Sequence, residues 1–308
     1  MTSEYSGSDF SGHYPIREFA RLTGVNPVTL RAWERRYGII QPQRTDKGHR
    51  FYSEADIQRI QNILYWLDQG YPIRQVRLLL QNNQIISQQD DGWQTIREQH
   101  INYLSRGQLQ QLDNLITDGF ANYPMAVYYE RCLQPVMAFL QSEPLLYQLY
   151  CQQLKRKLIC LVHQQQKHNS GPVLLLLSNH DQNEIAMYAM AYALGAAAFR
   201  VEVYCQTITP AELSQLVTLL NCSQLWADLC ASVSGKTEQW QQQLNELQQS
   251  LPVFSNLAGG DISATSDTND NKPVSAARGI WQLPESFAEQ LAFFIQHQNI
   301  TSQPKVRL

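Results

Sequence analysis

The chain has 308 residues, about twice the length of a typical domain, so its length predicts two or three folded units. Its 44% hydrophobic and 10% aromatic content is typical of globular proteins. The longest apolar runs, such as Val173 to Leu177, are too short to cross a bilayer, which argues against a membrane partner. Residues 1–13 lack the cationic start and apolar core of a signal peptide, so we expect a disordered tail on a cytoplasmic protein.

The formal net charge of −3 is unevenly distributed along the chain. Residues 14–80 hold 11 Lys and Arg against 6 Asp and Glu, whereas the rest of the chain holds 13 against 21. A basic N-terminal module joined to an acidic remainder is typical of a DNA-binding domain that carries a regulatory domain. The charge pattern therefore favours a nucleic-acid partner for the first 80 residues.

The first predicted elements are two helices separated by a tight turn. Apolar residues recur at helical spacing from Ile16 to Leu22, and Gly24 then interrupts the pattern. Asn26 can cap a second helix, and Pro27 suits its first position. That helix is expected to run on to Tyr37 and to end at Gly38. A helix, a glycine-containing turn and a second helix predict a helix-turn-helix.

The next predicted element is a wing, formed by two short strands between Gln41 and Tyr52. The sequence Asp46-Lys47-Gly48 supplies the turn between the two strands. Two further helices follow the wing and are separated at residues 70–72, completing a compact winged helix-turn-helix over residues 14–81.

Two further regions follow the polar residues 82–92, which we interpret as a linker. Residues 93–168 carry helical periodicity with three breaks, which predicts an all-helical bundle of about four helices. Between residues 170 and 300, five predicted strands alternate with helices, which predicts an α/β domain with a doubly wound parallel sheet of the Rossmann or flavodoxin-like kind. Residues 258–279 are expected to be a flexible insertion in that domain. The chain is thus expected to be a multidomain protein.

The predicted DNA-contacting residues lie on the second helix and the wing. The second helix of a helix-turn-helix enters the major groove, where arginine can pair with guanine or neutralise phosphate. The alternative interpretation is a solvated charged surface, but crowding cations on a short wing is unfavourable unless a polyanion lies opposite. The predicted residues are Thr29, Arg31, Arg35 and Arg36 on the helix, and Arg44, Lys47, His49, Arg50 and Tyr52 on the wing.

Residues 14–80 closely resemble the DNA-binding domain of the MerR family of transcription regulators. The resemblance rests on TLR, an aromatic-Glu-Arg stretch, P-x-R, G-x-R-x-Y and the acidic start of the following helix, all in order. It implies a homodimer that binds double-stranded promoter DNA and activates transcription by RNA polymerase. It also implies that Thr29, Arg31, Arg44, Arg50 and Tyr52 lie at the DNA.

The stretch TLRAWERRYG resembles the branch of this family in which the winged helix is followed by a helical bundle and a cobalamin-binding domain. Within that branch the whole chain is most similar to a regulator of curli and biofilm-matrix genes, which implies a biofilm role. The branch places a cobalt-ligating histidine, followed by a glycine, just after the first strand of its sheet. Asn183 and Ala186 occupy those two places here, beside His180 and Asp181.

The cobalamin site is therefore expected to be degenerate. An amide is a poor cobalt ligand, and the methyl group of Ala186 restricts the approach of the corrin. We expect no cofactor, and a C-terminal region that senses an unknown small-molecule effector or contacts other proteins. The alternatives are a cobalamin-dependent light-sensing or redox-sensing repressor, with His180 as a replacement ligand, and a corrinoid enzyme.

Neither catalysis nor metal binding is predicted from the motifs of the sequence. The chain has no GxGxxG, Walker, GxSxG or HExxH motif, so we expect that it is not an enzyme. The six cysteines are spaced too widely for CxxC metal or redox pairs, and we expect no metal site. The crevice beyond the strand ends remains the default ligand site of an open parallel sheet.

Overall fold

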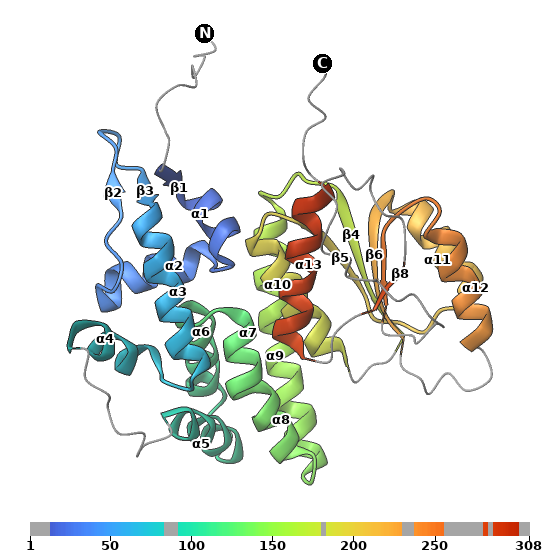
Figure 1. The fold of residues 1–308 in the computed structure, drawn as a ribbon. Helices are drawn as coiled ribbons and strands as arrows, with labels where there is room; N and C mark the ends of the chain where they lie inside the picture. The colour runs from blue at the N-terminus through green and yellow to red at the C-terminus, as the bar shows by residue number, and fades with distance from the viewer. Residues whose placement is uncertain are drawn as a thin grey trace, which may run out of the picture. The chain divides into compact units, whose positions relative to one another are not determined.

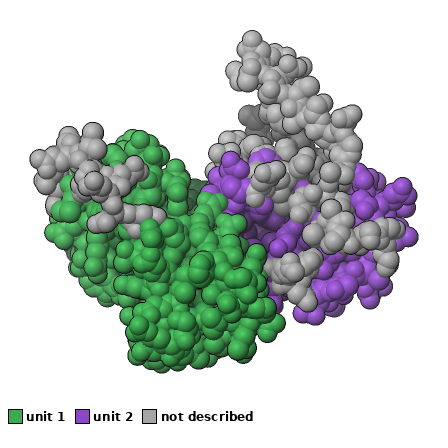
Figure 2. All heavy atoms as spheres, turned by 90° about the horizontal axis from the view of Figure 1, so that it is seen from below, with its two compact units in different colours: residues 1–157, 196–198 green, residues 158–195, 199–308 purple. Residues whose placement is uncertain are grey.

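The computed structural model describes residues 13–82, 92–179, 183–229, 237–255, 280–282 and 286–301. The chain divides into two compact units, shown in Figure 2, and each is described by itself. Unit 1 comprises residues 1–157 and 196–198, and unit 2 comprises the remainder. Several expectations lie outside the described residues: the tail up to residue 12, most of the linker, the insertion 258–279, and His180 with Asp181.

Unit 1 begins with the predicted helix-turn-helix (Figure 1). Gly24, at a φ of 69°, ends the first helix, and the side chain of Asn26 accepts a 2.9 Å hydrogen bond from the backbone N–H of Val28 at the start of the second. The second helix differs from the expected uninterrupted one because its last five residues form a π-helical turn that ends at Gly38. The elements are α1 (Ile16–Thr23), α2 (Pro27–Ala32) and η1 (Trp33–Tyr37).

The predicted wing is present as the strands β2 (Gln43–Arg44) and β3 (Arg50–Ser53). A third strand, β1 (His13–Pro15), pairs antiparallel with β3, so the sheet has the order β1-β3-β2. The sequence does not predict β1, and His13, which was assigned to the tail, lies in it. Strand β3 is therefore the central strand of the wing sheet, with β1 on one edge and β2 on the other.

Two helices complete the DNA-binding module, as predicted. They are α3 (Glu54–Asp68) and α4 (Ile73–Asn82). Ser53 and Asp56 form a capping box at the start of α3, in which each side chain accepts a hydrogen bond from the backbone N–H of the other. This cap fixes the point at which the wing strand turns into the helix.

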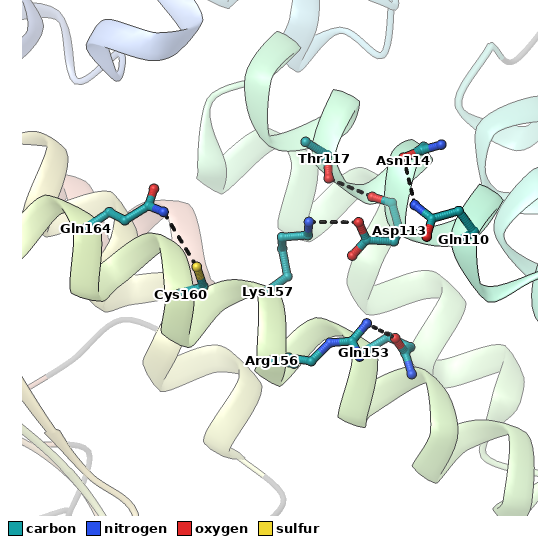
Figure 3. Close-up of polar contacts among 9 residues, drawn as sticks. All are labelled: Gln110, Asp113, Asn114, Thr117, Gln153, Arg156, Lys157, Cys160 and Gln164. Atoms are coloured by element: carbon teal, nitrogen blue, oxygen red, sulfur yellow. Dashed lines mark hydrogen bonds and ion pairs between the residues drawn. The ribbon is translucent and has the colours of Figure 1, made fainter.

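The rest of unit 1 is helical, with one nearly continuous helical stretch between Met125 and Leu140 that includes a second π-helical turn. Lys157 of the last helix reaches Asp113 of α6 at 2.9 Å, as Figure 3 shows. At the centre, the buried ring of His100 lies between the hydroxyls of Tyr128 and Tyr150, at 3.0 and 2.9 Å. Burial lowers the pKa of His100 to about 3, so this histidine is neutral near pH 7. The helices are α5 (Gly92–Ser105), α6 (Leu109–Asn122), α7 (Met125–Tyr128), η2 (Tyr129–Leu133), α8 (Gln134–Leu140) and α9 (Pro144–Gln166), whose residues from Leu158 onwards belong to unit 2.

Unit 2 contains the predicted parallel sheet, with the strand order β5-β4-β6-β7-β8. The first strand, β4 (Val173–Ser178), lies inside the sheet, with β5 (Arg200–Tyr204) on one side and β6 (Cys222–Asp228) on the other. The chain therefore passes from β4 outwards to β5 and then crosses back over β4 to β6. The strand order changes direction between β4 and β6, and open α/β sheets bind ligands at such a point. The remaining elements are α10 (Glu184–Ala196), α11 (Pro210–Leu219), α12 (Thr237–Leu247), β7 (Val253–Ser255), β8 (Ile280–Gln282) and α13 (Phe287–Thr301).

Both faces of this sheet are covered by helices (Figure 1). On one face Leu175 and its neighbours pack against α11 and α12, with the buried Trp240 at the centre. On the other face Phe294 of α13 packs against Trp226 and Phe254, with ring centroids 5.5 and 4.9 Å apart. This burial on both sides accounts for the nearly continuous apolar runs of the strands. Within the described residues, no helix has the length and apolar character needed to span a membrane.

Candidate DNA-binding surface

The second helix of the module exposes two arginines on one side. Leu30 and Trp33 are fully buried, which fixes the rotation of the helix about its axis. Arg31 and Arg35 are exposed and are four residues apart, so they lie on the same outward face, one turn from each other. The packing of the helix therefore directs both guanidinium groups towards solvent.

The tip of the wing is shaped by Thr45. Its backbone N–H donates to the carbonyl of His49 at 2.9 Å, and its hydroxyl accepts a 3.1 Å hydrogen bond from the backbone N–H of His49. Gly48 closes the turn at a φ of 80°, in the left-handed region that favours glycine. Lys47 and His49 are exposed as a result.

Glu34 joins the wing to the helix. Its carboxylate accepts hydrogen bonds from Arg44 Nη2 at 2.7 Å and from Arg50 Nε at 2.5 Å. The side chain of Glu34 is only 19% exposed. Burial alone would raise the pKa of this carboxyl, but the hydrogen bonds from Arg50 and Arg44 outweigh that effect and lower it. One carboxylate thus fixes an arginine from each wing strand beside the exposed face of the helix.

Arg36 has a different position from the other predicted arginines. Its Nη1 lies 2.9 Å from Asp118 Oδ1 and 3.2 Å from Asn122 Oδ1, both in α6. The indole N–H of Trp33 donates to the backbone carbonyl of Asn122 at 2.7 Å. The end of the second helix is therefore anchored to the helical bundle within unit 1.

Thr29 and Tyr52 lie beneath this surface. They are 0% and 1% exposed, and the ring of Tyr52 stacks on Phe19 at 4.1 Å. Burial raises the pKa of Tyr52 to about 12. Direct contact of either side chain with DNA would need a rearrangement of the module, so their predicted role at the DNA stays a prediction. In this structure both side chains belong to the buried interior of the module.

Comparisons with known proteins agree with this geometry. Residues 14–83 match the family described as MerR HTH family regulatory protein. The HTH-type transcriptional regulator MlrA of Escherichia coli (strain K12) is 41% identical over 130 residues, which are 42% of this chain and 53% of that protein. MlrA of Salmonella typhimurium (strain SL1344) is 31% identical over 201 residues, which are 64% of this chain and 81% of that protein. This chain belongs to the MerR family.

The MerR-family protein is thus a helix-turn-helix transcription regulator that is similar to MlrA. The match spans about half the length of the E. coli relative and 81% of the Salmonella one. The HTH-type transcriptional repressor CarH of Myxococcus xanthus is 24% identical over 259 residues, which are 78% of this chain and 85% of that protein. The similarity to CarH therefore extends well beyond the DNA-binding module.

Glu34 is the residue of this MerR surface that the sequence analysis missed. It is the acidic residue of the aromatic-Glu-Arg stretch on which the family resemblance rests, and it was not assigned a role. A single acidic residue between exposed arginines of the second helix was the available signal, because such a carboxylate needs cationic partners. The partners themselves lie 10 and 16 residues away, on strands whose approach the sequence does not specify.

We expect Glu34→Gln to lower the ratio of specific to non-specific DNA affinity by roughly 1 kcal/mol, about fivefold. The variant frees the two wing arginines and removes a negative charge from the surface, so it weakens positioning while it strengthens attraction to any phosphate backbone. Filter binding to a promoter site and to random DNA at several salt concentrations measures the ratio. Glu238→Gln, an exposed change on α12, is the control. An unchanged ratio would contradict the positioning role.

The same variant tests the pKa of Glu34. Because the folded protein lowers this pKa below its ordinary value of 4.5, the ion pairs contribute stability that is complete above pH 4.5 and is lost as the pH falls through the lowered pKa. The difference in melting temperature between wild type and Glu34→Gln should therefore be largest near pH 7 and disappear at acidic pH. A difference that stays constant as the pH falls from 7 to well below 4.5 would contradict this assignment.

The predicted degenerate site in unit 2 is only partly described. Asn183 Nδ2 donates to Asp228 Oδ2 at 2.7 Å, so this pair connects the start of α10 to the carboxyl end of β6. Ala186 lies in the first turn of α10. The residues present do not fit cobalamin, because the amide in the ligand's place is held by a carboxylate and a methyl group stands where the approach of the corrin needs glycine. The described residues include no group of three or more side chains that could hold a metal ion.

Proposed function

We propose that the protein recognises promoter DNA as a homodimer and activates transcription by RNA polymerase. The observation that carries this proposal is the surface on which Glu34 holds Arg44 and Arg50 beside Arg31 and Arg35. In this arrangement the second helix enters the major groove, and the wing, with Lys47 and His49 at its tip, follows the phosphate backbone.

Dimerisation follows from the geometry of recognition. One module covers only one half-site, and two modules related by a two-fold axis read a pseudo-palindromic site with greater affinity. Chromosomal DNA as the target places the protein in the cytoplasm, where it acts by binding and not as an enzyme. By its resemblance to the regulator of curli and biofilm-matrix genes, we place genes of that type among the targets.

The rest of the chain is assigned a regulatory role. We divide it into a helical bundle over residues 93–168 and a flavodoxin-like, cobalamin-binding-like domain over residues 170–300, following the DNA-binding module at 14–81. The parallel sheet, with its first strand inside the sheet, supports this fold. We assign this half of the chain to sensing a small-molecule effector or to protein contacts, without cobalamin.

The second candidate function is a cobalamin-dependent light-sensing or redox-sensing repressor. The similarity to CarH, a repressor by name, over 78% of this chain favours this alternative. The hydrogen bond from Asn183 to Asp228 argues against it, since it occupies the amide that stands in the ligand's place.

Mapping the DNA bound in cells, followed by transcription in vitro from the sites found, tests the proposed function. We expect one inverted-repeat motif within promoters, and more transcript when the protein is added. Bound DNA without a shared motif would contradict sequence-specific recognition, and less transcript would favour the repressor.

We expect no cobalamin binding. The physical reason is the loss of both the nitrogen ligand and the space beside it, at Asn183 and Ala186. Titration of adenosylcobalamin and hydroxocobalamin into the protein, followed by the visible spectrum and by calorimetric heat, measures this. The double variant Asn183→His with Ala186→Gly is the matched comparison, because it restores both requirements. Stoichiometric micromolar binding by the wild type, with nitrogen coordination to cobalt, would contradict the prediction.

A further inference from the structure

Two adjoining hollows lie between the DNA-binding module and the helical bundle, both within unit 1. Their volumes are about 480 and 560 Å³, within the range of sites for small organic ligands. They share four lining residues: Tyr37, Arg74, Asp118 and Asn122. Elements η1, α4 and α6 therefore meet around one concave surface.

The rim of these hollows is cationic. Arg36, Arg74 and Arg77 line the smaller hollow, where Asp118 is the one acidic lining residue. Asp118 is paired with Arg36 at 2.9 Å, and in the described part of the chain no ion pair joins Arg74 or Arg77 to a carboxylate. Three guanidinium groups around one carboxylate leave an excess of positive charge that an anion would neutralise.

The larger hollow has an apolar and aromatic floor. Ile73 and Tyr123 are almost fully buried there, and Tyr128 is completely buried. Tyr37 is half-buried between the two hollows, near enough to Arg74 for that guanidinium to affect its hydroxyl. An apolar floor beside convergent cationic groups is the usual composition of a site for an organic anion.

We propose that these hollows bind a small organic anion, a ring-containing molecule with a phosphate or carboxylate group, and that this ligand regulates DNA binding. The ring lies against Tyr37, which lines both hollows, and its acidic group pairs with Arg74 and Arg77. The regulatory part of this inference rests on the proposed DNA-binding function.

The route from the ligand to DNA is short. Arg36 and Tyr37 belong to η1, which directly continues the second helix of the module. An acidic group near Arg74 also competes with Asp118 for Arg36, and so alters one of the contacts that anchor this helix to α6. The residues that line the smaller hollow come from η1, α4 and α6. Occupancy therefore shifts the orientation of the arginines that face the groove.

Phenyl phosphate is the test ligand for the full-length protein, with inorganic phosphate and phenol as its two halves. At ten times its dissociation constant we expect phenyl phosphate to raise the melting temperature by about 2–4 °C. Arg77→Ala should weaken its binding about tenfold. Arg106→Ala, an exposed arginine that follows α5, is the matched control and should bind like the wild type. Benzoate replaces phenyl phosphate in a parallel titration and separates carboxylate from phosphate ligands.

DNA binding is then measured with and without phenyl phosphate. We expect the ligand to change the affinity of the wild type for its promoter site, and Arg77→Ala to abolish that change while binding DNA normally without ligand.

Absence of phenyl phosphate binding by the wild type, or equal phenyl phosphate binding by Arg77→Ala, overturns the proposal. Equal affinity for inorganic phosphate overturns the role of the ring. Weaker DNA binding by Arg77→Ala in the absence of ligand, with phenyl phosphate binding intact, assigns these arginines to the DNA backbone instead. Failure of the wild type to bind any specific DNA would instead refute the proposed function.

Discussion

Arg31→Ala and Arg50→Ala are each expected to weaken binding to the specific promoter site by about 1–3 kcal/mol, roughly 5- to 150-fold. Arg31 projects from the exposed face of the second helix, and Arg50 is held beside it by Glu34. Each substitution removes a guanidinium group that can pair with a base edge or a phosphate. Mobility-shift titrations at one fixed salt concentration compare the variants with the wild type.

Two further measurements make this result interpretable. Thermal unfolding should show that Arg31→Ala keeps the stability of the wild type, because its side chain is exposed. Arg17→Ala, an exposed change on α1, should leave affinity for the promoter site nearly unchanged. If both Arg31→Ala and Arg50→Ala bind as tightly as the wild type, the assignment of the surface is wrong.

Trp33→Ala is expected to destabilise unit 1 by about 3–5 kcal/mol. The indole is fully buried and donates its N–H to the carbonyl of Asn122, so the substitution leaves a large cavity and removes a hydrogen bond between η1 and α6. Hydrogen exchange followed by mass spectrometry measures the effect, because it distinguishes amides of unit 1 from those of unit 2.

The comparison with Trp33→Phe separates packing from hydrogen bonding. Phenylalanine refills most of the cavity but cannot donate, so we expect a smaller loss, of about 1–3 kcal/mol. Amides in β4 and β6 of unit 2 should exchange as in the wild type. Uniform loss of protection in both units would show that they unfold together, and unchanged protection in unit 1 would contradict the anchoring role of Trp33.

Local signals in the sequence predicted most of the helices and strands of this protein, although not β1 or the π-helical turn of the second helix. Asn26, Pro27 and Gly38 mark the ends of the second helix, and the apolar run from Val173 to Ser178 is the first strand of the parallel sheet in the structure. These features depend on residues that are close together along the chain, where capping, glycine conformation and periodicity act.

The features that the sequence did not predict depend on distant pairings. Strand β1 forms only because β3 offers it an edge, and the strand order in unit 2 depends on how the helices pack. Two neighbouring exposed arginines also differ in their contacts: Arg36 pairs with Asp118, 82 residues away, whereas Arg35 lies on the outward face with Arg31. Successive residues on a helix point in different directions, and the position of α6, which decides that Arg36 meets a carboxylate, depends on tertiary packing.

The bond from Trp33 to Asn122 bears on how regulators of this kind can be recombined. A chimera that takes only residues 14–81 from this protein would separate the indole from its acceptor and place a helix of another protein against η1. The transferable segment therefore extends through α6, and a junction placed after Gln166, where α9 ends, keeps donor and acceptor in the same parent and leaves that helix whole.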